Sequence, residues 1–466
     1  MYVWAQPGNY WSNSFNTESS LLSGAVVGGN AGITAIFYNP AGISDITESR
    51  FDLNASLFNL EHKTYENPLG DNTYMDNYTF TVFPRFTSYL FQSKKFKNLS
   101  YQFAIFNRNI ARTEIYTKVS DPNSSLILLN ENEEYTGLFD LSSRYDDYWG
   151  SMGVSKRIND QWSVGLSLNI SIQSVSYFRS AIANVFPTNL DDSSLLFVSS
   201  SWSSNEKITA YNWRFIGKLG FIYRDKNWHL GASVTLPSLL LFGNADVNKT
   251  VSQTNIFHNH QRIPDYYLNE YPQYVYFEIK DPFSVSLGWS YIAPKSKDEY
   301  YITLEYFAPI KEYFFIDPTR KTSESTTYGT RFSAYKIANK QVLNLALGFK
   351  KMFNEKLGFL AGFRTDFNPY IMGYNPKYWE SNSFEALNIN LFHLTGGVKF
   401  NYRKSSFIVG IQQSVGFEGK QVEFVNFSEP ESYNPETKLA LQGERKNDMS
   451  YFYNSLGFYF GFSIVF

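Results

Sequence analysis

Four basic side chains are the main candidates for binding chemistry in this sequence: Arg214, Lys218, Arg364 and Lys399. Each stands in a segment of alternating polarity, at a position whose parity predicts a side chain facing inward. The same parity applies to four other titratable residues: His229, Glu305, Asp366 and His393. An inward cation in an apolar cavity can hold the carboxylate of a ligand. The alternative, which we favour for any one residue, is an internal network of ion pairs that anchors one part of the chain to another.

Metal-binding chemistry has weaker candidates. His258 and His260 form a His-x-His pair, which a strand would place on one face. They fall in a predicted loop, 255–261, with no carboxylate nearby before Asp265, so we interpret them as polar loop residues. Three acidic clusters are interpreted as solvated loop ends rather than calcium sites: Glu131–Glu134, Asp146–Asp147 and Asp191–Asp192. No metal and no cofactor is expected.

Catalytic chemistry finds little support. A hydrolytic site needs a positioned Ser/His or Asp/His pair, and only His229 and His393 are predicted to lie inside, neither within a recognisable motif. The absence of cysteine excludes thiol nucleophiles, disulfides and thiolate zinc sites. There is no P-loop, dinucleotide fingerprint or zinc-protease motif. We expect a protein that is not an enzyme.

The composition limits which elements can position these residues. Aromatic residues make up 18% of the 466 residues, with 35 Tyr and 42 Phe, and such residues favour strands and membrane interfaces. No apolar run approaches the ~18 residues of a membrane-spanning helix. Lys and Arg number 41 against 43 Asp and Glu, which offers no electrostatic case for nucleic acid.

The alternation is clearest at the C-terminal end. From Phe452 to Phe466 the even positions are apolar except for Asn454, and the odd positions are mostly small or amphipathic. Residues 162–173 repeat the pattern. One face of such a strand suits lipid and the other a packed lumen. A soluble sandwich fits less well, because nearly every segment has one apolar face and one small or polar face.

Segments of this kind number about 14, over approximately 50–60, 76–92, 98–109, 143–156, 161–177, 207–223, 227–240, 274–291, 300–313, 331–351, 357–368, 387–402, 406–419 and 448–466. Short connections alternate with long polar ones, near 110–142, 178–206, 241–273, 314–330, 369–386 and 420–447. This alternation is typical of outer-membrane barrels, which have tight periplasmic turns and extended outer loops. We therefore predict an all-β fold, a transmembrane antiparallel β-barrel of about 14 strands, over residues 49–466.

Residues 1–48 differ in kind. They are rich in glycine, contain no Lys or Arg, and lack sustained strand alternation. Their apolar residues, including Leu21, Val26 and Ile36, argue against a disordered leader, so we predict an N-terminal plug, or hatch, inside the lumen. The first residues lack the basic region and apolar core of a signal peptide, and we presume that such a peptide has already been removed.

The stretch Gly28–Ile43 contains a run of small residues that ends in Asn39-Pro40-Ala41-Gly42 followed by an aliphatic residue. It resembles the N-terminal hatch of the FadL-type long-chain fatty-acid transporters, a family of outer-membrane transporters for hydrophobic compounds. The resemblance implies a 14-stranded barrel with a hatch. On turn chemistry alone, Asn39 can bridge neighbouring backbone, Pro40 fixes φ and Gly42 permits a reversal. The plain alternative is a turn that leads into the first strand.

Pro84 lies inside the second predicted strand, where it removes a ladder hydrogen bond and indicates a bulge or local opening. The resemblance implies a lateral exit at a kink in the third strand. The third predicted strand, over 99–109, contains no Gly or Pro. The sequence therefore departs from the family pattern at the position of the exit.

Two functions follow as hypotheses. The first is passive uptake of a long-chain fatty acid or another hydrophobic compound across the bacterial outer membrane, through an apolar lumen closed by the hatch. The second is a FadL-like structural or accessory subunit of a multi-protein outer-membrane complex, such as secretion or barrel-assembly machinery. The expected partners are outer-membrane lipid, a hydrophobic small molecule and other membrane proteins, but no nucleic acid.

Overall fold

The computed structural model describes residues 9–11, 15–46, 51–54, 57–83, 86–92, 99–124, 126, 133–188, 199–259, 261–320, 322, 324–327, 329–371, 389–402 and 405–464. The predicted all-β, antiparallel fold is confirmed, because every pairing between named strands is antiparallel and the helices are short. Within the described residues, no helix has the length and apolar character that crossing a membrane requires.

The strands are β1 (Phe51–Asn54), β2 (Leu57–Glu66), β3 (Tyr74–Phe83), β4 (Phe86–Gln92), β5 (Leu99–Ser124), β6 (Glu133–Arg157), β7 (Trp162–Pro187), β8 (Ser200–Arg224), β9 (Trp228–Thr235), β10 (Leu239–Thr254), β11 (Phe257–His258), β12 (Gln261–Arg262), β13 (Tyr266–Glu270), β14 (Val275–Phe277), β15 (Ser284–Ile292), β16 (Glu299–Phe307), β17 (Ile310–Asp317), β18 (Tyr335–Asn339), β19 (Val342–Met352), β20 (Leu357–Asp366), β21 (Leu391–Tyr402), β22 (Ser405–Gln421) and β23 (Met449–Ile464). The helices are α1 (Thr17–Leu21), η1 (Gly32–Thr34), α2 (Ala35–Tyr38), η2 (Pro40–Asp45) and η3 (Arg331–Ser333).

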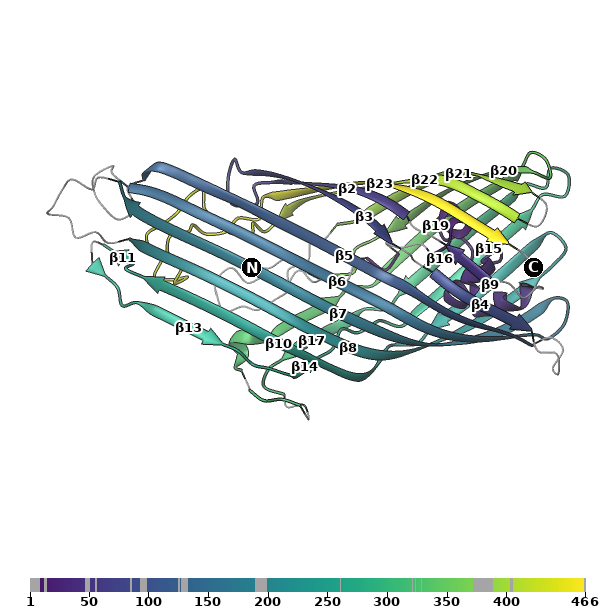
Figure 1. Ribbon diagram of the computed structural model, residues 1–466, viewed down its shortest axis with the longest axis horizontal. Coiled ribbons are helices and arrows are strands. Elements are labelled where there is room, and N and C mark those ends of the chain that lie inside the picture. The colour runs from purple at the N-terminus through teal and green to yellow at the C-terminus, as the bar shows by residue number, and fades with distance from the viewer. Residues whose placement is uncertain are drawn as a thin grey trace.

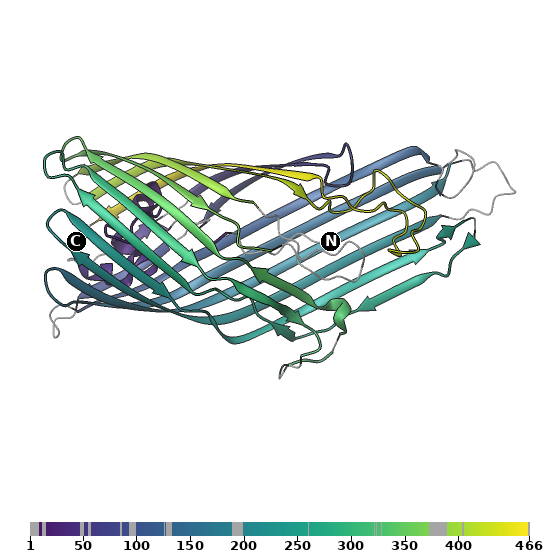
Figure 2. The ribbon, with the colours of Figure 1, turned by 180° about the vertical axis from the view of Figure 1, so that it is seen from behind.

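All strands except the small β11–β12 pair belong to one sheet, whose strands run obliquely along a common long axis (Figures 1 and 2). Successive long strands are neighbours, as in β5–β6, β6–β7 and β7–β8. The last strand, β23, pairs with β22 on one side and with β2 on the other, where Phe58 lies opposite Phe458. The sheet therefore hydrogen-bonds its last strand to one of its first.

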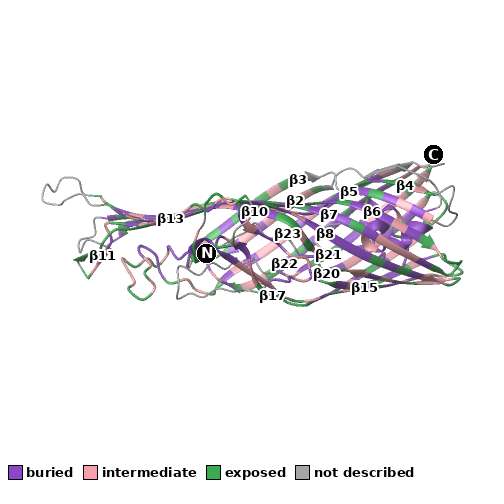
Figure 3. Ribbon diagram, turned by 90° about the horizontal axis from the view of Figure 1, so that it is seen from below, coloured by how far each residue is buried: buried purple, intermediate pink, exposed green. Residues whose placement is uncertain are grey.

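Along the long strands, buried residues alternate with more exposed ones (Figure 3). In β7, Leu168 and Ile170 are exposed, whereas Ser167 and Asn169 are buried. This confirms the alternation predicted for residues 162–173. An apolar outer face and a polar inner face are the reverse of a soluble sheet, and they suit a sheet surrounded by lipid.

Four strands are much longer than predicted. β5 and β7 each have 26 residues, and β6 and β8 have 25. Much of the predicted loops near 110–142 and 178–206, and the start of the one near 241–273, is therefore strand, and those predictions were wrong there. The reason is that outward positions such as Arg112, Glu114 and Lys118 become polar, which removes the apolar face on which the prediction relied. At 3.3 Å per residue such strands are roughly 85 Å long. A strand that crosses a bilayer needs only about 9–11 residues.

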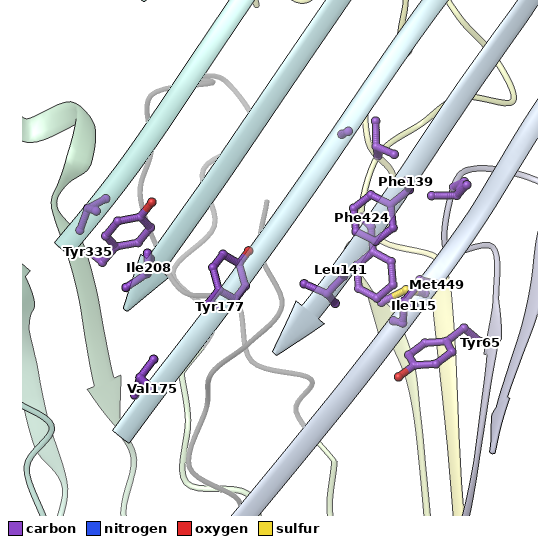
Figure 4. Packing of buried hydrophobic residues seen from close by; sticks show 14 of the residues in the cluster. Tyr65, Ile115, Phe139, Leu141, Val175, Tyr177, Ile208, Tyr335, Phe424 and Met449 are labelled. Atoms are coloured by element: carbon purple, nitrogen blue, oxygen red, sulfur yellow. The ribbon is translucent and has the colours of Figure 1, made fainter. Parts of the chain in front are cut away.

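The interior holds two large apolar clusters. One lies among the extended parts of the strands and includes Tyr65, Phe139, Ile208, Tyr335 and Phe424 (Figure 4). The other lies at the end of the molecule that also holds the C-terminus (Figure 1), and it is built around the N-terminal segment, by which we mean residues 9–11 and 15–46. Two of the predicted binding residues, Lys218 and Lys399, contact the N-terminal segment within this second cluster.

Candidate functional site

The Asn39–Gly42 motif connects the helices of the N-terminal segment to the sheet. The Asn39 side chain is fully buried, and its Oδ1 accepts a hydrogen bond from Ala41 N at 3.2 Å. Its Nδ2 donates to Val27 O at 2.9 Å and to Phe221 O of β8 at 3.1 Å. Pro40 begins helix η2, where its missing N–H costs nothing. One side chain thus joins the two halves of the N-terminal segment and ties both to a strand.

The N-terminal segment packs closely against glycines of the strands. A Cβ on Gly220 would lie 2.2 Å from Asn39 Oδ1, and one on Gly165 would lie 2.3 Å from the Pro40 carbonyl carbon. These two glycines are direct partners in the β7–β8 ladder. A second ladder pair, Gly231 and Gly288, receives Val27 and Gly28 in the same way. These four glycines were not predicted as part of the site. Their signal in the sequence was the recurrence of glycine at positions predicted to face inward.

Lys399 is an anchor for the N-terminal segment. Its Nζ lies 2.8 Å from Glu18 Oε2 in α1, and Lys350 Nζ lies 3.2 Å from the other Glu18 oxygen and 3.1 Å from Glu299. Burial alone would raise the pKa of Glu18, but the two lysines outweigh it and lower that pKa to about 2. The Glu18 carboxylate is therefore held ionised between two strands.

Lys218 is a second anchor. Its Nζ donates to the Phe37 carbonyl at 2.5 Å and lies 4.9 Å from the centre of the Phe37 ring. The ammonium thus satisfies a carbonyl near the end of the short helix α2 and makes a cation–π contact with the same residue.

Arg214 lies farther along the sheet, in β8, and is fully buried. Its guanidinium is 3.2 Å from Asp147, pairs with Asp281, and donates to Ser171 Oγ at 2.7 Å. The prediction that Asp146–Asp147 is a solvated loop end was wrong, since both residues are buried inside β6. The register of β5 shifts opposite them, between Asn107 and Asn109. Asp147 shares its parity with the buried residues Tyr145 and Trp149, whereas Asp146 pairs with the exposed Arg144.

Arg364 lies beside a small aromatic cavity of about 340 Å³, the candidate ligand pocket. The residues that line it come mainly from the N-terminal segment: Tyr10, Trp11, Phe15, Ser23, Gly24, Phe37, Tyr38, Arg108 and Arg364. Trp11 is held at both ends, because its backbone N donates to Asp366 at 2.9 Å and its indole N–H to Glu305 at 2.6 Å. Asp366 and Glu305, both predicted to face inward, therefore position Trp11 in the lining of the pocket.

A second cavity of about 660 Å³ lies against other residues of the same segment: Val26, Gly29, Asn30, Ala31, Gly32, Asn39, Gly42, Asp45 and Ile46, with Ile222 of β8. Asp45 is ion-paired with Arg157 at 2.9 Å and with Arg224. Because the two sets of lining residues share none, the N-terminal segment walls two separate cavities.

Pro84 lies outside the described residues, but the ladder changes partner there. β3, before it, pairs with β2, whereas β4, after it, pairs with β1 and β5. Beyond Phe106, β5 has no strand partner on that side among the described residues. Two side chains reach across instead, since Lys63 Nζ donates to Arg112 O at 2.9 Å and Asn77 Nδ2 donates to Glu114 O.

The remaining predicted residues are dispersed. His393 is buried, with Nδ1 2.7 Å from Ser414 Oγ and Nε2 3.8 Å from Asp366. His229 lies beside Gly29, where an added Cβ would be 3.1 Å from its Nδ1. His258 is in the small β11–β12 hairpin, and His260 lies outside the described residues.

No protein-family model matches the sequence, and no curated protein matches it. The fold is similar to those of two solved proteins. The first is the P. putida toluene transporter TodX, with 14% identity, 97% of this chain and 99% of that chain covered, and a TM-score of 0.58. The second is a Pseudomonas aeruginosa FadL homologue, with 11% identity, 98% and 100% covered, and a TM-score of 0.59. At the level of fold, this confirms the resemblance to FadL-type transporters, and neither neighbour is described as an enzyme.

Proposed function

We propose that this chain is an outer-membrane β-barrel that takes up a small hydrophobic compound by diffusion. The observation that carries the proposal is the aromatic pocket of about 340 Å³, with two arginines in its lining, at the face of the N-terminal segment. Ligand pockets are typically apolar, with a few polar groups that fix orientation. The transport named for the toluene transporter agrees with this assignment.

The barrel itself is part of the proposal. If the pieces β1–β2, β3–β4, β9–β10, β13–β15, β16–β17 and β18–β19 each form one spanning strand, the wall has 14 strands. The recorded pairings join each of these strands to the next, and the β23–β2 ladder joins the last to the first. Closure would leave no free edge at the level of that ladder, as lipid requires.

The N-terminal segment would be the hatch, within residues 1–48, and the wall would cover residues 49–466. Its contacts support this, because they come from opposite sides of the wall. Leu21 lies against Gly397 and Gly410 of β21 and β22, whereas Pro40 lies against Gly165 of β7. A ligand in the aromatic pocket would reach the second cavity only if the hatch moved.

The exposed side chains support one orientation in the membrane. In the first part of β5, the exposed positions hold Phe103 and Ile105. Later in the same strand, they hold Arg112, Glu114 and Lys118. The apolar band would lie in the hydrocarbon at the level of the hatch, and the polar parts of the strands would project outside the cell.

The lining of the pocket indicates the ligand class. Its walls are largely aromatic, which suits an apolar group. Arg108 and Arg364 favour a ligand with an anionic end. We therefore propose a hydrophobic carboxylate as the preferred ligand.

The test is equilibrium binding of radiolabelled octanoate and toluene to the purified protein in detergent. Arg364→Gln should weaken octanoate binding at least tenfold, about 1.4 kcal/mol, and leave toluene binding within twofold. Trp11→Ala should weaken both. Lys118→Gln, on the outer face of β5, is the matched control for loss of a cation and should change neither. Equal octanoate affinity in the wild type and Arg364→Gln would refute the assignment of the anionic end.

A second function has its own observation. Among the extended parts of the strands, the lumen is filled by the cluster that includes Tyr65, Phe139 and Phe424, and a filled lumen suits a structural subunit of a larger outer-membrane complex. Native mass spectrometry of the protein extracted from its own membrane separates the two functions. Stoichiometric protein partners without a small-molecule adduct would favour the subunit.

A further inference from the structure

Three carboxylates from distant parts of the sequence meet at the outer end of the sheet. Asp71 lies in the turn between β2 and β3, Glu423 follows β22, and Asp448 precedes β23. One carboxylate oxygen of each lies within 4.8 Å of the other two. No sequence motif marks this group, because Asp71 is separated from the other two by most of the chain.

The spacing fits one ion. Two oxygens on opposite sides of a calcium ion, each 2.3–2.6 Å from it, lie roughly 4.6–5.2 Å apart. Mutual separations within 4.8 Å therefore fit a single calcium ion without rearrangement.

Glu423 provides an independent indication of a missing ligand. Its side chain has no exposed surface. Its Oε2 accepts a hydrogen bond from Lys446 N at 2.9 Å, whereas its Oε1 is buried and makes no hydrogen bond to any described residue. A buried carboxylate oxygen without a partner costs free energy, and a bound cation removes that cost.

The local charge balance points the same way. The Lys446 ammonium lies 2.7 Å from Asp71 and 2.8 Å from Glu429. With Glu423 and Asp448 there are four carboxylates here, against the Lys446 ammonium and the Arg445 guanidinium, whose Nη1 donates to Glu423 O at 3.2 Å. A divalent cation would reduce the excess negative charge, which a second hydrogen bond would not.

We propose that Asp71, Glu423 and Asp448 bind a calcium ion, which fastens residues 422–448 over the outer end of the lumen. That segment is already hydrogen-bonded to the β2–β3 turn, because Phe424 N donates to Pro68 O at 2.9 Å and Phe427 N donates to Leu69 O at 2.8 Å. Its residues Phe424, Phe427 and Leu441 are buried in the outer apolar cluster. The ion would join both ends of the segment to the turn. This proposal does not depend on the proposed function.

The first experiment is calcium titration of the full-length purified protein in detergent, free of lipopolysaccharide, by isothermal titration calorimetry. The wild type is expected to bind about one ion per chain, and Asp448→Asn to bind it at least tenfold more weakly. Glu436→Gln removes an exposed carboxylate of the same segment and should match the wild type. With the ion bound, tryptic cleavage after Lys438 should slow severalfold relative to protein in chelator.

The competing explanation is a proton on Glu423, because burial raises the pKa of this carboxyl to about 8 even though the Lys446 N–H lowers it. Glu423→Gln mimics that protonated state. Under our proposal it abolishes calcium binding while it leaves the melting temperature in chelator at or above that of the wild type. Absence of calcium binding by the wild type, or equal binding by Asp448→Asn, would overturn the proposal.

Discussion

Glu18 is the residue on which the ionic attachment of the N-terminal segment depends. It contacts Lys399 of β21 and Lys350 of β19, so one carboxylate joins helix α1 to two strands. Its hydrogen bonds are charge-assisted and partly buried, which makes them stronger than those of a surface pair. The attachment should therefore respond to acid.

We predict that Glu18→Gln lowers the stability of the protein at pH 7 by about 2 kcal/mol. The folded-state pKa of Glu18, about 2, lies below its ordinary value of 4.5, so its contribution is fully present above pH 4.5 and is lost as the pH falls toward 2. Calorimetric melting from pH 7 to pH 2 should show the wild type losing its advantage over the variant in that window. A constant difference across the range would contradict the assignment.

The parity of the strands predicted that Arg214, Lys218, Arg364 and Lys399 face inward, and all four are buried or half-buried. Their partners could not be predicted, because Glu18 is 381 residues from Lys399 and Phe37 is 181 residues from Lys218. Asp146 and Asp147 were interpreted as a solvated loop end because adjacent acidic residues are typical of one. Their arginine partners, Arg144 and Arg214, could not be read from that pair of residues.

At the scale of elements, helix η2 approaches β7 and β8 so closely that only glycine fits between them. Gly165 and Gly220 leave space for Pro40 and Asn39, and the hydrogen bond from Asn39 to Phe221 depends on this approach. The Asn39–Gly42 motif therefore fits against Gly165 and Gly220 of the sheet. In the sequence these two residues appear only as scattered glycines.

We predict that Gly220→Ala loosens this contact, because its Cβ would overlap Asn39 Oδ1. In planar bilayers the variant should show open-channel events severalfold more often than the wild type. Gly150→Ala is the control, since a Cβ there meets no atom within 4 Å. If both variants conduct like the wild type, the close fit does not keep the lumen closed.

The alternation of residues 162–173 was sufficient to predict β7, but it could not predict that β7 continues to Pro187. Outside lipid the outward side chains need not be apolar, so a strand that continues beyond a membrane has the composition of a loop. Beyond the predicted end at residue 177, the inward side chains Ala181, Ala183 and Val185 carried the missing signal, since all three are buried.

At the scale of the whole molecule, two segments would close the proposed barrel. The helices of the N-terminal segment would fill one end, and residues 422–448, with Phe424, Phe427 and Leu441, would cover the other. A barrel closed in this way would pass a solute only when one of the two segments moves.

We predict that deletion of residues 1–45 makes cells sensitive to large hydrophilic antibiotics, because the wall would remain while its filling is lost. Growth inhibition by vancomycin measures this, with Gly150→Ala expressed at the same level as the control. Unchanged sensitivity, with the variant folded and inserted by heat-modifiability on gels, would show that this segment does not block the lumen.

The pairing of Phe58 with Phe458 also bears on how the molecule is made. Contacts between residues so far apart in sequence form slowly, because a long loop must close before they stabilise anything. The ladder between β2 and β23 cannot form until β23 has been synthesised, and until then one edge of β2 is unpaired. The chain needs protection against aggregation until this ladder joins the last strand to the rest of the sheet.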